Sequence, residues 1–84
     1  MYYVYILESL KNGDYYKGST ENYLKRFEEH NRGEGQYTKS QCPWKIIFVQ
    51  IFYNKREALI REKQLKKCNK EYLRWLIQQP QNIL

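Results

Sequence analysis

The chain has 84 residues, of which 17% are aromatic, and its 15 Lys and Arg residues against 9 Asp and Glu residues give a formal net charge of +6. This length has room for one domain, expected over residues 1–84, whose small core depends on large aromatic side chains. No apolar run approaches the roughly 20 residues of a membrane-spanning helix, and two cysteines with a single histidine exclude a structural zinc site.

Cys42 and Cys68 are the only cysteines. They either form one disulfide or remain reduced. In a chain that shows no signal peptide the reduced state is the simpler interpretation, so we expect a cytoplasmic protein.

The first expected element is a strand over Tyr2–Leu7, where every residue is apolar or aromatic. Side chains alternate along a strand, so Tyr3, Tyr5 and Leu7 share one face, and Val4 and Ile6 share the other. A strand that is apolar on both faces is expected in the interior of a sheet.

Asn12-Gly13 predicts a hairpin with a two-residue type I′ turn, followed by a return strand over Tyr15–Ser19. In that register Tyr5 and Tyr16 share a face but are offset by four residues, or roughly 13 Å. A wider loop or a bulge that shifts the register by an even number would bring the two tyrosines closer and keep the face. Gly18 has no side chain, which inside a strand is typical of a place where a ligand or another backbone comes close.

A helix is expected over about Asn22–Asn31, because Ser19, Thr20 and Asn22 are residue types that cap a first helical turn. We expect the helix to pack through Leu24 and Phe27. Arg26 and His30 are four positions apart and therefore share a face. Gly33 and Gly35 end this helix, and residues 32–41 are expected to form a surface loop.

Three further elements complete the expected order ββαβαα. A strand over Trp44–Tyr53 is apolar on both faces. A helix from the cap Asn54 to about Cys68 has an inward stripe of Ala58, Glu62 and Leu65, with Leu59 beside it. A last helix over about Lys70–Gln78 buries Leu73, Leu76 and Ile77. Because a buried carboxylate is costly, Glu62 requires an Arg, a Lys or a metal ion as a partner.

Positive charge is concentrated between Lys55 and Arg74, where eight basic residues stand against three acids. Such a face favours a polyanion, first of all nucleic acid, although it is also typical of a solvated helix surface. The side chains that we expect to contact nucleic acid are Lys17, Lys25, Lys39, Arg61, Lys63, Lys66 and Lys67. For Lys17 a plain solvent-facing strand position is the alternative.

Two tyrosines, an arginine, a histidine and a glutamate form a set that suits phosphodiester hydrolysis. This reaction needs a base for the attacking water, a cation for the charge on the phosphate, and a metal ion to polarise it. A free tyrosine has a pKa of about 10, so a tyrosine base needs a nearby cation or acceptor, for which Arg26 and His30 are available.

The chain also resembles the GIY-YIG nucleases. The two motifs that name this family occur in degenerate form as Tyr3-Val4-Tyr5 and Tyr16-Lys17-Gly18, with Tyr5 and Tyr16 eleven positions apart. The similarity continues through Asn22–Arg26, His30-Asn31, Tyr37-Thr38, Pro43-Trp44, Ala58 and Arg61–Lys66, and it covers about residues 2–78. Tyr3 stands where glycine is common, Lys17 where an apolar residue is common, and Ser19 where repair-incision members have lysine. Neither Asn69 nor Asn82 matches a late asparagine that some members carry.

This resemblance implies an α+β fold with a three-stranded, largely antiparallel sheet flanked by helices, and metal-dependent cleavage of DNA with Mg²⁺ or Mn²⁺. It implies that Tyr5 is the general base and that Tyr16 positions water or phosphate. Arg26 would stabilise the phosphate charge, and His30 would bond to the catalytic tyrosine. Glu62 would bind the divalent cation.

The function expected from the sequence is a metal-dependent endonuclease, selective for DNA structure and linked to repair or recombination, acting as a monomer or weak dimer away from membranes. Protein partners are not indicated. The alternative is a non-catalytic nucleic-acid-binding module with a degenerate site. In that alternative Tyr5 and Tyr16 are ordinary strand aromatics, and Arg26 with Glu62 is a buried ion pair.

Overall fold

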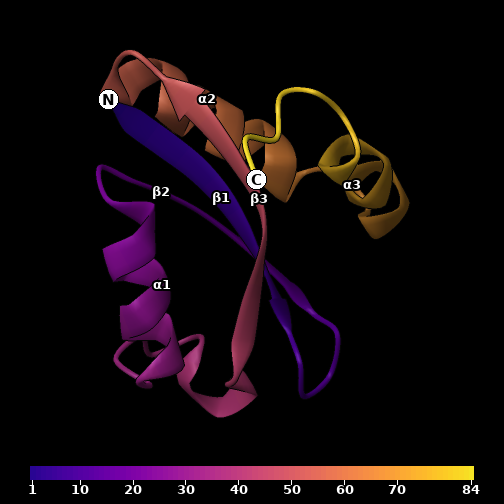
Figure 1. Cartoon of the computed structure of the whole chain (residues 1–84). Helices are drawn as coiled ribbons and strands as arrows, with labels where there is room; N and C mark the ends of the chain where they lie inside the picture. The colour runs from indigo at the N-terminus through magenta and orange to yellow at the C-terminus, as the bar shows by residue number, and fades with distance from the viewer.

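Three antiparallel strands form the centre of the structure, a computed structural model that describes residues 1–84. They are β1 (Tyr2–Ser9), β2 (Tyr15–Thr20) and β3 (Trp44–Phe52). The order across the sheet is β2-β1-β3, so the strand that is apolar on both faces is central, as predicted (Figure 1). The antiparallel sheet and the element order ββαβαα are both confirmed.

The hairpin between β1 and β2 differs from the prediction in its turn and its register. Residues 10–14 form the loop, and Gly13 has a φ of +81° whereas no residue other than glycine has a positive φ, so the turn is not type I′. Tyr5 pairs with Gly18 and Leu7 with Tyr16, which is a shift of two residues from the predicted pairing. Tyr5 and Tyr16 therefore keep the same face and are offset by two residues instead of four.

Three helices cover the two faces of the sheet: α1 (Tyr23–Asn31), α2 (Lys55–Lys66) and α3 (Lys70–Ile77). Asn22, Asn54 and Asn69 cap them, each with a side-chain oxygen that accepts from a backbone N–H of the first turn. The return strand ends at Thr20, one residue beyond the prediction, so Ser19 and Thr20 belong to β2 and only Asn22 of the three predicted capping residues caps α1. A short 3₁₀ helix, η1 (Lys39–Gln41), interrupts the predicted surface loop.

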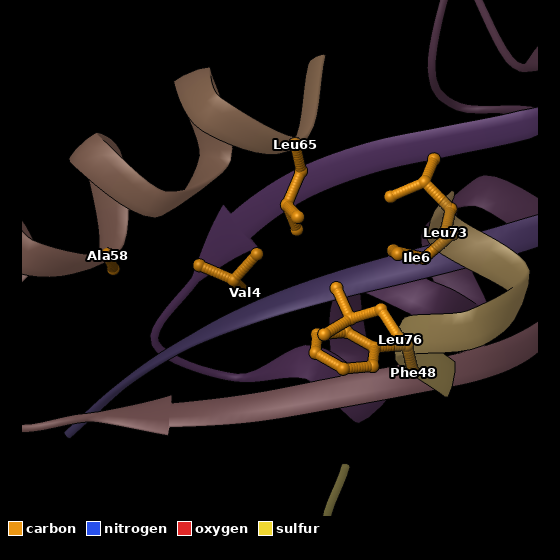
Figure 2. Packing of buried hydrophobic residues seen from close by; sticks show 7 residues of the cluster. All are labelled: Val4, Ile6, Phe48, Ala58, Leu65, Leu73 and Leu76. Atoms are coloured by element: carbon orange, nitrogen blue, oxygen red, sulfur yellow. The ribbon is translucent and has the colours of Figure 1, made fainter. Parts of the chain in front are cut away.

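Each face of the sheet has its own apolar core. Val4, Ile6 and Phe48 pack against α2 and α3 in a cluster that also contains Ala58, Leu65, Leu73 and Leu76 (Figure 2). On the opposite face Tyr5, Leu7, Trp44 and Val49 pack against Tyr23 and Phe27 of α1. The faces predicted for β1 are thus confirmed, and α1 lies on the other side of the sheet from α2 and α3 (Figure 1).

Two predicted core positions were wrong. Leu24 is 57% exposed and Leu59 is 42% exposed. Tyr23 occupies the inward position instead of Leu24, because its ring packs edge-on against Tyr3 with the ring centroids 5.0 Å apart. On α2 only Ala58 and Leu65 are buried.

The two cysteines are free, so the disulfide that the sequence left open is not formed. None of the helices has the length and the apolar character required to cross a membrane.

Candidate active site

A buried tyrosine and a buried histidine meet on the α1 face of the sheet. The hydroxyl oxygen of Tyr5, in the central strand, lies 3.1 Å from Nε2 of His30, in the last turn of α1. On the other side of the imidazole, Nδ1 lies 2.7 Å from Oγ1 of Thr38. Tyr5, His30 and Thr38 are each no more than 2% exposed, so the imidazole and both of its bonds are buried.

Thr38 is itself fixed by its neighbours. Its hydroxyl lies 3.5 Å from the carbonyl oxygen of Gly35, and its own carbonyl accepts a bond of 3.0 Å from the indole Nε1 of Trp44. The thiol of Cys42 donates to the carbonyl oxygen of His30 at 2.9 Å. These contacts fix the loop after α1, and with it the side of the imidazole that faces away from Tyr5.

Gly18 makes room for the hydroxyl of Tyr5. It lies opposite Tyr5 in the sheet, and a Cβ at this position would lie 2.5 Å from the hydroxyl oxygen and 2.6 Å from Cζ of the ring. Any side chain would therefore displace the tyrosine. The group that comes close at Gly18 is thus the side chain of Tyr5, and not the ligand or backbone that the sequence predicted.

Tyr16 completes an aromatic wall beside the histidine. Its ring meets that of His30 edge-on, with the centroids 4.9 Å apart, and lies 6.3 Å from the ring of Tyr5. Tyr37 and Trp44 are also close, with centroid distances of 5.8 and 6.2 Å. The register shift in the hairpin makes this cluster possible, because it places Tyr16 only two residues from the level of Tyr5.

Arg26 approaches the same hydroxyl from α1. Its Nη1 is 2.9 Å from Oε1 of Glu29, so its partner is not the Glu62 of the predicted alternative ion pair. Burial raises the pKa of the Tyr5 hydroxyl, the nearby Tyr16 raises it further, and the charge of Arg26 opposes both effects. Tyr5 is therefore a neutral phenol at pH 7. Burial, reinforced by the charge of Arg26, lowers the pKa of His30, so the imidazole is neutral as well.

Glu62 reaches the site from the opposite face of the sheet. It lies on α2, its side chain is 16% exposed, and it accepts a bond of 2.5 Å from the hydroxyl of Ser19, the residue after Gly18 in β2. Its second oxygen lies 2.8 Å from Nζ of Lys66. The partner that the sequence required for Glu62 is thus a lysine together with a serine hydroxyl.

The carboxylate of Glu62 fits a hard divalent cation. Mg²⁺ is commonly held by one or two carboxylates, with water and substrate phosphate completing its six positions. The ammonium group of Lys66 already places a positive charge beside this carboxylate, and the Lys66 side chain is about half exposed. No group of three or more His, Cys, Asp or Glu side chains occurs that could hold a metal ion, so Glu62 would be the one protein carboxylate on the cation.

The predicted nucleic-acid-binding side chains divide into those near the site and those away from it. Lys17 and Lys66 line a groove next to Tyr16, and Lys25 lines a polar pocket with Arg26. Arg61 is held on the β3 side of α2, where its Nε donates to Gln50 at 3.2 Å. The other three predicted residues line neither the groove nor the pocket. They are Lys39 in η1, Lys63 on the outer side of α2 and Lys67 at its C-terminal cap.

Sequence reasoning missed two side chains of the site as functional candidates. Thr38 lies in a stretch predicted as an exposed loop, and the only signal that singled it out was the place of Tyr37-Thr38 in the family resemblance. Ser19 was interpreted as a helix-capping residue. The two asparagines considered and set aside are structural: Asn69 caps α3, and Asn82 bonds to the backbone of Val49 and Ile47.

Comparison with known proteins gives a consistent result. A family model described as "GIY-YIG catalytic domain" matches residues 1–74. A UPF0213 protein of Clostridium perfringens is 44% identical over 71 residues, which cover 83% of this chain and 75% of that protein. A UPF0213 protein of Halobacterium salinarum is 39% identical over 77 residues, covering 87% of this chain and 99% of that protein. The solution NMR structure of a UPF0213 protein from Bacillus halodurans matches with a TM-score of 0.61 and 31% identity, over 96% of this chain and 87% of that one.

Proposed function

Because this chain belongs to the GIY-YIG family of nucleases, we propose that it is a metal-dependent endonuclease that hydrolyses phosphodiester bonds of DNA. The observation that carries the proposal is the hydroxyl of Tyr5, held 3.1 Å from His30 and close to the charge of Arg26, with Glu62 bonded to Ser19 beside Gly18. This arrangement supplies a base, a phosphate-binding cation and a metal ligand around one point. A preference for DNA structure over sequence, a role in repair or recombination, and a cytoplasmic location are parts of the same proposal.

The proton path starts at Tyr5. In the tautomer that we propose for His30, Nδ1–H donates to the hydroxyl of Thr38, which donates to the carbonyl of Gly35, and the free lone pair of Nε2 accepts the proton of Tyr5. The oxygen of Tyr5 then takes a proton from the attacking water as its own proton passes to Nε2. The raised pKa of Tyr5 keeps its hydroxyl protonated at pH 7. The transfer of this proton to Nε2 is therefore necessary for the oxygen to act as a base.

Arg26 stabilises the negative charge that develops on the phosphate oxygens as the bond from water to phosphorus forms. Glu29 holds the guanidinium in place through their bond of 2.9 Å. Glu62 is the side chain that would hold the divalent cation, with Ser19 orienting the carboxylate. When bound, such a cation polarises the phosphate and stabilises the departing oxygen.

The test is cleavage of labelled DNAs (single strand, duplex, nicked, flap and four-way junction) with Mg²⁺, Mn²⁺ or chelator. Glu62→Ala and Tyr5→Phe should lose cleavage, the latter by about 10²- to 10⁴-fold. Glu57→Ala is the matched control, because Glu57 is an exposed glutamate in the first turn of the same helix. Binding without cleavage by the wild type under every metal condition would reject the enzyme and favour the binding module.

A further inference from the structure

A groove leads away from the candidate active site along the edge strand β2. Its first part, about 280 Å³, is lined by Tyr16, Lys17, Tyr37 and Lys66 together with Tyr15. Its second part, about 320 Å³, shares Tyr15, Lys17 and Tyr37 with the first and continues to Lys70 on α3. Because the two parts have three lining residues in common, they form one continuous path.

Tyr37 is the most exposed aromatic side chain of this groove. It is 65% exposed, although its ring centroid lies only 5.8 Å from that of Tyr16 in the site. The contact with Tyr16 holds the ring in place while most of its surface stays in solvent. An exposed and immobilised ring of this kind is a platform on which a nucleobase can stack.

Positive charges accompany the aromatic rings along the groove. Lys66 stands at the end nearest Glu62, and Lys17 stands in the middle. Lys70 stands at the far end, where its Nζ lies 4.7 Å from the ring centroid of Tyr15 and donates to the carbonyl oxygen of Gly13. Asp14 is the one acidic side chain that lines either part. Alternating rings and lysines are the pattern of a surface that binds single-stranded nucleic acid.

We propose that this groove is a subsite for an unpaired nucleotide next to the scissile phosphate, with its base stacked on Tyr37 and its backbone beside Lys17 and Lys70. The proposal rests on DNA as the substrate of the proposed function. Bases within an uninterrupted duplex have their faces covered by their neighbours and cannot stack on Tyr37. The preferred substrate is therefore a strand that is single or flapped at the cleavage point.

Binding measured in chelator tests the subsite without requiring cleavage. Fluorescence anisotropy with a labelled single strand should show that Tyr37→Ala weakens affinity by about 5- to 100-fold. Tyr37→Phe should bind as the wild type does, since it retains the ring. Tyr53→Ala is the matched control, because Tyr53 is a more exposed tyrosine in the loop before α2, and it should bind normally. A blunt duplex should show little dependence on Tyr37.

The results separate this subsite from the proposed activity. Equal affinity of the wild type and Tyr37→Ala for the single strand overturns the subsite, even if the protein cuts DNA with Mg²⁺. Dependence of single-strand binding on Tyr37 supports it, even if no DNA is cut and the proposed activity fails. Photocrosslinking to a strand that contains 5-iodouracil gives a direct reading: a crosslink at Tyr37 supports the subsite, and crosslinking confined to other residues overturns it.

Discussion

Gly18→Ala is the smallest change that should disable the candidate site. The new Cβ would lie 2.5 Å from the hydroxyl oxygen of Tyr5 and 2.6 Å from Cζ, whereas ordinary contacts are 3.4 Å or longer. The tyrosine must therefore move by about 1 Å or more, which changes the geometry of its 3.1 Å contact with His30. The φ of Gly18 is not positive, so the backbone accepts alanine and the clash is the only penalty.

Two magnitudes follow from this displacement. Overpacking of a core typically costs about 1–3 kcal/mol, and in a domain of this size each kcal/mol lowers the melting temperature by about 4–8 °C. A displacement of about 1 Å at a reacting group can reduce the rate by about 10²-fold. Gly18→Ala should therefore fold with reduced stability and cleave DNA at about 1% of the wild-type rate or less. Thermal denaturation and kcat/KM for the best DNA substrate measure the two effects.

A double-mutant cycle shows whether Tyr5 is the cause. If the clash is with this ring, Gly18→Ala should cost almost no stability in a Tyr5→Ala background, because the space is then open. An equal loss of stability in both backgrounds, or a fully active Gly18→Ala protein, would refute the reasoning from the packing of Gly18 against Tyr5.

Three further outcomes can be measured. Thr38→Val removes the hydroxyl that meets His30 and should cost about 1–3 kcal/mol in urea unfolding together with loss of cleavage, while Thr38→Ser should keep both properties. The lowered pKa of His30 means that the unfolded chain binds a proton below about pH 6.5 before the folded protein does. Stability and cleavage should therefore both be intact at pH 7.5 and fall as the pH drops through the folded pKa, and His30→Gln should flatten this acid-side loss of melting temperature. Leu65→Ala should cost about 2–5 kcal/mol of unfolding free energy, whereas Leu59→Ala should stay within about 0.5 kcal/mol, because only Leu65 is buried.

The elements of the fold could be predicted because their signals are local. The unbroken apolar run of β1 and the asparagine caps of α1 and α2 depend on residues next to one another in the sequence. The wider loop was one of two hairpin geometries that the sequence left open, and local residues could not decide between them, because Ser9 organises the loop through a distant contact. Its hydroxyl accepts from the N–H groups of Lys11 and Asn12 and donates to the carbonyl of Gln41, 32 residues away. This tertiary bond favours the wider loop over the two-residue turn that Asn12-Gly13 predicts.

The candidate site was predictable to a similar extent. The spacing of Arg26 and His30 on one helix face follows from helical geometry, and the structure brings both to Tyr5. Thr38 could not be predicted, because a threonine in a polar loop becomes buried only when Trp44 and Gly35 enclose it. The inward orientation of Glu62 was predicted from its place in an apolar stripe of the helix. Its partner Ser19 could not be predicted in the same way, because this contact depends on the register of β2.

The candidate site combines residues from both faces of the sheet, and the edge strand β2 connects them through Gly18 and Ser19. Tyr5 belongs to the central strand, where its pairing with Gly18 on one side and Val49 on the other fixes its backbone. Glu62 approaches from the opposite face through Ser19, the neighbour of Gly18 in β2. Adjacent residues of one strand point to opposite faces, so the sheet itself sets Tyr5 and Glu62 relative to each other through Gly18 and Ser19. A constellation anchored in this way is more precise than one carried by loops, and the missing side chain at Gly18 is what leaves room for the hydroxyl of Tyr5.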